Sequence, residues 1–167
     1  MVLLIVGAVL AVSLVMLGAT LAGAPAPTPA ASEQPGTDAA PREVNVIMRD
    51  YHFDPSPLYL YPGETIQLNV FNGGMVEHEL VLGDESVQDA WSNEDAVNTP
   101  PAPFATTAPA SVDPNVGGLR ILLASGGSTS VIYHVPGTGT LQMLCHLPGH
   151  LEQGMAADVV LVTPSSR

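Results

Sequence analysis

A thiol, two imidazoles and a thioether lie close together in the last quarter of the chain, in the run Cys145-His146-Leu147-Pro148-Gly149-His150-Leu151-Glu152-Gln153-Gly154-Met155. Four residues separate Cys145 from His150, and four more separate His150 from Met155. A thiolate, two imidazoles and a weak axial thioether form the ligand set of a blue-copper electron-transfer centre, whose donors suit both Cu(I) and Cu(II). The types and spacing of these residues therefore predict a copper site.

One equatorial imidazole has to come from another part of the chain, and His78 is the natural candidate. A strand that folds back beside the Cys145 loop would bring it to the metal. On an alternating strand His78 shares its face with Val76 and Leu80, so its side chain points to the core. A core histidine needs a polar partner, which is ordinarily another protein group, but a metal ion would also serve.

These motifs resemble the cupredoxins, the type 1 blue copper proteins that include plastocyanin and azurin. The resemblance rests on the C-x4-H-x4-M spacing, on Pro148-Gly149 before the second ligand histidine, and on Asn72-Gly73-Gly74 upstream of His78-Glu79. The ligand loop is most similar to that of rusticyanin, and about residues 44–162 follow the family pattern. The resemblance implies a cupredoxin fold and one copper ion as the cofactor.

The resemblance also assigns roles to the ligand residues. It implies that His78, Cys145 and His150 are the equatorial ligands and that Met155 is the axial ligand, with Met75 and the Glu77 carbonyl as weaker axial competitors. His150 would lie near the surface as the electron port, among the apolar residues Met75, Leu147 and Leu151. Glu79 stands where plastocyanin has an Asn that braces the ligand loop, so the bracing bond would have to be made differently here.

The other three histidines are not predicted to be ligands. His146 lies on the strand face opposite to Cys145, so its ring should point away from the metal. It is either a packed or solvent-facing side chain or an outer group that tunes or relays electrons. His52 and His134 lack companions at ligand spacing and are interpreted as structural.

Short alternating segments separated by Pro and Gly turns predict an all-β fold, an antiparallel Greek-key β-sandwich of about eight strands. The expected strands are residues 44–49, 58–61, 66–71, 77–82, 119–124, 129–135, 140–145 and 156–162. Such a sandwich would position the ligand loop at one end.

The chain before the sandwich has two compositions. Residues 1–24 are uncharged and apolar, and they are long enough to cross a bilayer. No basic residue precedes this run, which argues against a signal peptide, yet Ala22-Gly23-Ala24 suits a signal peptidase, so a cleaved signal and a retained anchor both stay open. Either one would place the rest of the chain outside the cytoplasm, in the periplasm or on the outer face of the membrane. Residues 25–41 are rich in Pro and Ala and are predicted to be a disordered linker.

The cupredoxin domain is predicted to span residues 42–167, with an insertion at 83–118 that is acidic at first and then rich in Pro and Ala. Within the insertion, Val87, Ala90 and Trp91 share one face at helical spacing, which favours a short amphipathic helix over residues 86–97. The insertion is either a solvated segment pinned by Trp91 or a lid or docking element.

Charge and cysteine content limit the function. The 167 residues carry 16 acidic and 4 basic side chains, for a formal net charge of −12. This charge would repel nucleic acid, and it either steers a basic redox partner or serves solubility. The single cysteine excludes an internal disulfide and a two-thiolate binuclear copper centre, so Cys145 is a ligand, a nucleophile or a buried apolar residue.

The sequence predicts a monomeric one-electron carrier between extracytoplasmic redox partners, such as a cytochrome or an oxidase, and not an enzyme. Multicopper oxidases place a His on both sides of the ligand Cys and add His-x-His pairs, whereas Leu144 precedes Cys145 here and the sequence contains no His-x-His. Nitrite reduction needs a second copper site, for which too few histidines are left. The alternative is a copper-binding or delivery protein of copper homeostasis that uses the same ligands.

Overall fold

The structure is a computed structural model that describes residues 34–98 and 117–163. The apolar segment 1–24, the linker up to residue 33 and the centre of the insertion lie outside the described residues. Within the described ranges, no helix is both long and apolar enough to span a membrane.

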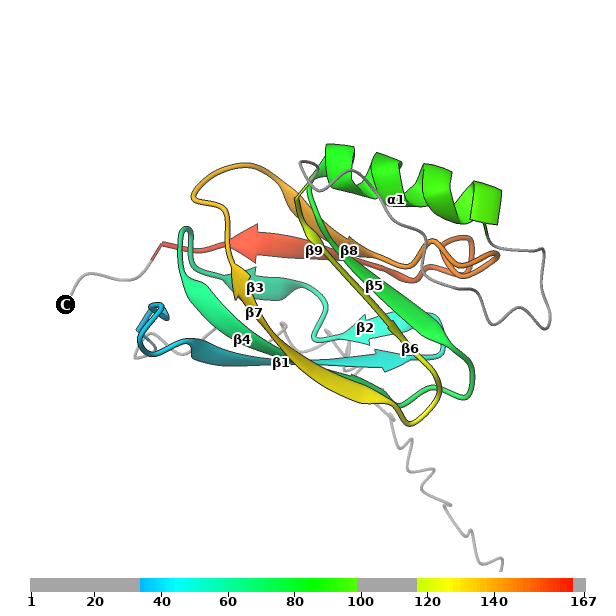
Figure 1. Ribbon diagram of the computed structural model, residues 1–167, viewed down its shortest axis with the longest axis horizontal. Helices are drawn as coiled ribbons and strands as arrows, with labels where there is room; N and C mark the ends of the chain where they lie inside the picture. Colours follow the sequence, from blue (N-terminus) through cyan, green and yellow to red (C-terminus); the bar gives the residue numbers. More distant parts are fainter. Residues whose placement is uncertain (1–33, 99–116, 164–167) are drawn as a thin grey trace, which may run out of the picture.

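The described residues form nine strands and one helix, arranged as two packed sheets with the helix on one of them (Figure 1). The elements are β1 (Arg42–Arg49), β2 (His52–Asp54), β3 (Leu58–Leu60), β4 (Thr65–Asn72), β5 (His78–Gly83), α1 (Glu85–Asn98), β6 (Leu119–Leu123), β7 (Ser128–His134), β8 (Leu141–Leu144) and β9 (Ala156–Leu161). The predicted β-sandwich is therefore confirmed, with β2 as a strand that the sequence did not predict.

The two sheets have the strand orders β2-β1-β4-β7 and β3-β9-β8-β5-β6. Non-consecutive strands become neighbours because the chain repeatedly changes sheet, as in a Greek-key arrangement. The expectation of purely antiparallel sheets is wrong, since β1 pairs with β4 and β3 pairs with β9 in parallel. Alternation of apolar and polar residues identifies a strand and its inner face, but it does not encode the direction of the neighbouring strand.

The core lies between the sheets and explains the alternating sequence. In β1, Val44, Val46 and Met48 are buried while the residues between them face outward. All six residues of β5 are buried, because the core covers one of its faces and α1 packs against β5 from the other side. A strand covered on both faces gives His78 a dry and rigid position at its start.

Helix α1 confirms the helix predicted over residues 86–97. The Asp84 carboxylate caps its first turn by accepting hydrogen bonds from the Val87 N–H (3.1 Å) and the Ser86 hydroxyl (2.7 Å). Val87 fits closely against the sheet, because a Cβ at Gly83 or Gly118 would lie 2.4–2.5 Å from Val87 side-chain atoms. This part of the insertion is a helix packed on the sandwich and not a solvated loop.

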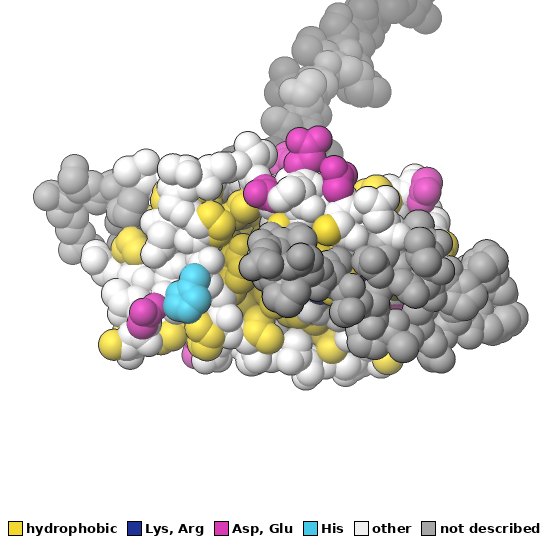
Figure 2. All heavy atoms as spheres, turned by 45° about the horizontal axis from the view of Figure 1, so that its top comes forward, with side chains coloured by type: hydrophobic (Ala, Val, Ile, Leu, Met, Phe, Trp, Pro, Cys, Tyr) yellow, Lys and Arg dark blue, Asp and Glu magenta, His cyan; other side chains and the backbone are white. Residues whose placement is uncertain are grey.

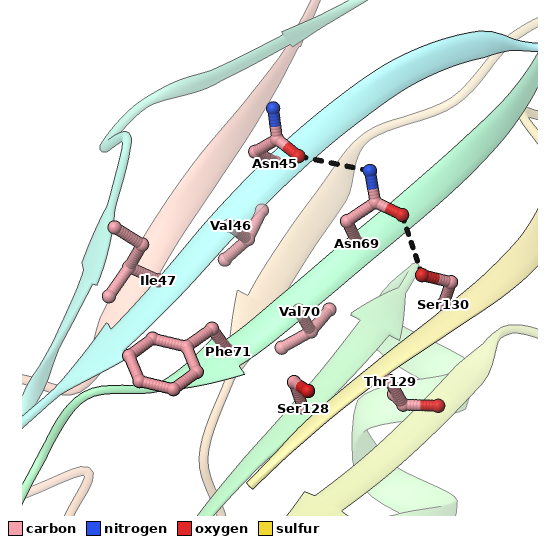
Figure 3. A pocket seen from close by; sticks show the side chains of 9 residues that line it. All are labelled: Asn45, Val46, Ile47, Asn69, Val70, Phe71, Ser128, Thr129 and Ser130. Carbon is pink, nitrogen blue, oxygen red and sulfur yellow. Dashed lines mark hydrogen bonds between the residues drawn. The ribbon is translucent and has the colours of Figure 1, made fainter. Parts of the chain in front are cut away.

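Among the described residues, no helix covers the outer face of the four-stranded sheet (Figure 1), and a shallow hollow lies there over β1, β4 and β7. Figure 3 shows a polar ladder across it, in which Asn69 Nδ2 donates to Asn45 Oδ1 (3.0 Å) and the Ser130 hydroxyl donates to Asn69 Oδ1 (2.7 Å). Phe71 lies at one end of the hollow and is 44% exposed. The ladder ties the three strands together on their solvent side.

The end of the expected linker is part of the folded domain. Thr37 and Ala40 pair in a tight turn. The Gly36 N–H donates to the buried Glu64 carboxylate at 3.1 Å, and Arg42 donates to the same carboxylate at 2.6 and 2.8 Å. Residues 34–41 are therefore folded, unlike the disordered linker predicted up to Pro41. The reason is that the carboxylate of Glu64, which is distant in the sequence, binds this segment, and local composition cannot reveal such a contact.

Glu64 is expected to make the stability of the domain depend on pH. Burial alone would raise the pKa of its carboxyl, but hydrogen bonds from Arg42 and from the Tyr61 and Gly36 N–H groups outweigh burial and hold the pKa below its ordinary 4.5. The pKa of Glu64 is lower in the folded than in the unfolded protein. The stability that its ionised carboxylate contributes is therefore complete above about pH 4.5 and is lost as the pH falls through the folded-state pKa. Replacing Glu64 with Gln should therefore lower the free energy of unfolding by about 2 kcal/mol at neutral pH.

Urea unfolding of the metal-free protein at several pH values measures this effect. The difference in the free energy of unfolding between the parent and Glu64→Gln should disappear in acid. Glu43→Gln, on the exposed start of β1, is the control and should stay within about 0.5 kcal/mol of the parent. A gap that stays constant from neutral pH to pH 3 would contradict the assignment.

Candidate metal centre

Three of the predicted ligands meet at one point. His78 at the start of β5, Cys145 just after β8 and His150 in the following loop place one donor atom each within 4.8 Å of one another. The Nδ1 atoms of the two imidazoles are 3.2 Å apart, and the Cys145 Sγ lies 3.3 Å from the His150 Nδ1. Residues 67 positions apart in the chain are thus brought together, as the sequence predicted.

The burial of the three groups suits metal binding. His78 and Cys145 are fully buried, whereas His150 is partly exposed. Burial lowers the pKa of His150, and the neighbouring His78 lowers it further. A neutral imidazole carries the lone pair that a metal needs. One sulfur and two nitrogens that converge in a dry setting are the donor chemistry of a copper site, so the residues present fit copper.

Met155 is fully buried beside the two loop ligands. Its carbonyl accepts a hydrogen bond from the Cys145 N–H (3.2 Å), and its own N–H donates to the His150 carbonyl (3.0 Å). The backbone thus holds Met155 against both residues, and its axial role stays a prediction. The Met75 side chain is 84% exposed, which disfavours this competing axial donor.

Asn72 organises the loop that leads to His78. Its fully buried side chain donates to the carbonyls of Val76 (2.9 Å) and Leu123 (2.8 Å) and accepts from the Gly74 N–H (2.9 Å). These bonds fix residues 73–77 between β4 and β5. Asn72 therefore braces the loop that leads to His78.

The turn between β1 and β2 covers the two imidazoles, a position that no local pattern predicted. The Asp50 carboxylate accepts from the Met75 N–H (2.8 Å) and lies 3.1 Å from the His78 Nε2. These two contacts hold the pKa of Asp50 below its ordinary value. Tyr51, in a left-handed conformation with φ of 66°, lies edge-on to His78 and His150 with ring centroids 6.0 and 5.1 Å away.

Glu79 itself braces the ligand loop that follows β8, through its carboxylate. Its fully buried carboxylate accepts from the Arg120 guanidinium and from the His146 N–H (3.1 Å), directly after Cys145. The Arg120 guanidinium also lies 4.8 Å from the centroid of the Trp91 ring on α1. This network links the cysteine strand to β6 and to the helix.

The ring of His146 points away from the metal ligands, as strand parity predicted. Its Nε2 lies 2.9 Å from the Oε1 of Gln88 on α1. Gln88 is itself buried, and its amide donates to three backbone carbonyls, those of Val81, Gly83 and Gln142. Gln88 was not predicted as a functional residue, although a polar residue beside Val87 on the inner face of the predicted helix was a visible signal.

Replacing His146 with Ala should leave copper binding and colour largely intact, because the ring Nε2 lies beside Gln88 Oε1 and His146 is not one of the three clustered donor residues. The expected loss is one hydrogen bond, about 1 kcal/mol of stability. Replacing His150 with Ala is the matched comparison and should open the site. Absorption spectra of both variants with one equivalent of Cu(II) measure the difference. Equal loss of copper from both would contradict the orientation seen here.

Other sequence-predicted residues also have clear positions. His52 is exposed on β2, and His134 is exposed on β7 near Thr65 (3.1 Å) and Asp38 (3.5 Å), so neither joins the ligand cluster. Leu147 is buried in the core, and its carbonyl accepts a hydrogen bond from the His150 N–H (3.0 Å).

The sequence matches no protein-family model. It does match a copper-resistant cuproprotein, CopI of Rubrivivax gelatinosus, with 33% identity over 130 residues that cover 77% of this chain and 72% of the relative. The chain belongs to the CopI family of cuproproteins. The family and the converging sulfur and nitrogen donors together identify copper as the metal of this site, with room for one ion.

Solved structures place this CopI-family chain in the cupredoxin fold. Auracyanin B aligns with a TM-score of 0.56 and 25% identity, over 79% of this chain and 93% of that structure. Auracyanin A, a "blue" copper protein from Chloroflexus aurantiacus, aligns with a TM-score of 0.50 and 21% identity, over 74% of this chain and all of that structure. The cupredoxin fold that the resemblance implied is therefore confirmed.

Proposed function

We propose that the protein is an extracytoplasmic type 1 copper protein that exchanges single electrons with protein partners in cells that resist copper. Copper bound by a thiolate and imidazoles alternates between Cu(I) and Cu(II) and so carries one electron. The observation that carries the proposal is the convergence of His78, Cys145 and His150 within 4.8 Å on a rigid sandwich. The apolar segment 1–24 supports a location outside the cytoplasm.

The surface around His150 supports an exchange of electrons with another protein. Met75, Val76 and Leu151 are exposed, and they belong to the two loops that carry His78 and His150. On the face seen in Figure 2, acidic side chains stand out in several places and basic ones hardly appear, in keeping with the net charge of −12. A basic redox partner with an apolar contact area would therefore suit this protein. The proposal includes no substrate turnover, on the sequence grounds given above.

A copper-binding or delivery role is the second candidate, and the copper-resistant relative favours it. The two functions differ in what leaves the protein. A carrier keeps its metal in both oxidation states and releases an electron, whereas a delivery protein releases the metal itself. Burial of His78 and Cys145 supports retention of the copper ion, because a competing ligand would need access to the ion to remove it.

Repeated reduction and reoxidation of the copper-loaded protein in the presence of a Cu(I) chelator separates the two candidates. Electron transfer predicts that the colour returns fully after each cycle and that the chelator stays unloaded. Transfer of copper to the chelator within one cycle would support delivery and contradict the carrier. The copper tolerance of cells that lack the protein tests the link to copper resistance. The parent gene should restore this tolerance, and a gene that encodes Cys145→Ser should not.

A further inference from the structure

A carboxylate that belongs to no predicted ligand lies on the outer side of the His78 ring. The Nδ1 of His78 faces His150 at 3.2 Å, and its Nε2 lies 3.1 Å from the Oδ1 of Asp50. The two nitrogens of one imidazole therefore have different partners. A hydrogen bond at Nε2 holds the proton there and leaves the lone pair on Nδ1, the atom that faces the metal centre.

The contact between Asp50 and His78 is built into the fold. A Cβ at Gly74 would lie 2.6 Å from both the Asp50 Oδ1 and the His78 Nε2, so only a glycine leaves space for the pair. Gly74 is held in place by Asn72 Oδ1, which accepts from its N–H, and by the Ser125 hydroxyl, which donates to its carbonyl at 2.6 Å.

The carboxylate is held in place as well. The Asp50 Oδ1 also accepts from the Met75 N–H at 2.8 Å, so both of its contacts come from the stretch that ends in His78. The next residue, Tyr51, adopts a left-handed conformation and lies edge-on against both imidazoles. The turn between β1 and β2 thus presents one negative charge to the back of one ligand ring.

We propose that Asp50 is a positioning residue for His78 and that its charge favours Cu(II) over Cu(I) at this site, which lowers the reduction potential. The inference rests on the proposed function. A charge-assisted bond makes the imidazole a stronger donor. The doubly charged ion gains more from a nearby negative charge than the singly charged ion does. The Asp50 side chain is 38% exposed, so water screens part of this effect.

Replacing Asp50 with Asn tests the charge, because the amide oxygen still accepts hydrogen bonds. We expect the ratio of Cu(I) to Cu(II) affinity to rise about tenfold, which corresponds to a potential about 59 mV higher for one electron. Replacing Asp50 with Ala also removes the hydrogen bond, so Cu(II) affinity should fall about 10- to 100-fold. Replacing Gly74 with Ala should displace the carboxylate while keeping it in the chain, and should change the Cu(II) spectrum as Asp50→Ala does.

Glu43→Gln is the matched control for charge, because it removes one acidic group from the opposite, exposed end of β1. Its reduction potential should equal that of the parent. Circular dichroism of each metal-free variant verifies the fold, and voltammetry and chelator competition measure the potential and the two affinities.

An unchanged potential in Asp50→Asn, with the blue band intact, would overturn the inference and leave the proposed function standing. An equal shift in Glu43→Gln would also overturn it, because the effect would then come from net charge. A parent protein that shows no thiolate-to-copper band would overturn the inference together with the proposed function.

Discussion

Replacing Cys145 with Ser is expected to abolish the blue colour of the copper-loaded protein. Cys145 is the single cysteine of the chain, so it is the sole source of thiolate-to-copper charge transfer. Copper affinity should fall by more than the 10- to 100-fold that is typical of losing an outer hydrogen-bond partner, because a ligand atom itself is exchanged. The fold should survive, since the two side chains have nearly the same shape.

Absorption spectroscopy and copper competition measure both changes. His134→Ala is the control, because it removes an imidazole that is 70% exposed and lies outside the ligand cluster, and its colour should match the parent. A Cys145→Ser protein that stays blue would refute the copper assignment. So would a parent protein that binds two copper ions tightly.

Replacing Glu79 with Gln is expected to be the most destabilising change, at about 3–5 kcal/mol. The Arg120 guanidinium would keep its buried position but lose a fully buried carboxylate, and breaking such a pair costs more than the pair contributes. The N–H of His146 would also lose a charged acceptor. The strand end that carries Cys145 should then become looser, and the copper band should broaden or shift.

Urea unfolding of the metal-free variants measures this effect. Replacing Glu79 and Arg120 together with Leu should recover much of the loss, because an apolar pair of similar volume needs no ionic partner. Glu152→Gln, on the exposed ligand loop, is the control and should change stability by no more than about 0.5 kcal/mol. A loss below 1 kcal/mol for Glu79→Gln would show that the pair is not structurally important.

The sequence was most informative where a pattern is local. The ligand spacing pointed to Cys145 and His150, and strand parity with the cupredoxin resemblance pointed to His78, which lies beside them. Alternation and turn residues predicted eight of the strands. The missed strand β2 has a single apolar residue, Phe53, between His52 and Asp54, so it shows no alternation to recognise, whereas the equally short β3 has two alternate leucines. Strand parity also gave the orientation of His146, because Cys145 directly follows a regular strand.

What the sequence did not predict depends on contacts between distant segments. Asp50 reaches His78 across 28 positions, and the Gly36 N–H reaches Glu64 across the same separation. The His146 ring reaches Gln88 across 58 positions. A carboxylate or an amide in a polar stretch is ordinarily a solvated side chain, and only the packing of the sheets reveals which ones bind a ligand ring or a backbone group.

The candidate ligands are divided unequally between two parts of the fold. Cys145, His150 and Met155 lie within eleven consecutive residues, whereas His78 belongs to β5, 67 positions before Cys145. A metal ion held by both parts would cross-link the chain across this interval. By the loop-closure entropy known from disulfides, such a cross-link raises stability by about 4 kcal/mol. Metal occupancy would then control the lifetime of the folded chain, because the loaded form unfolds more rarely and is exposed to proteases less often.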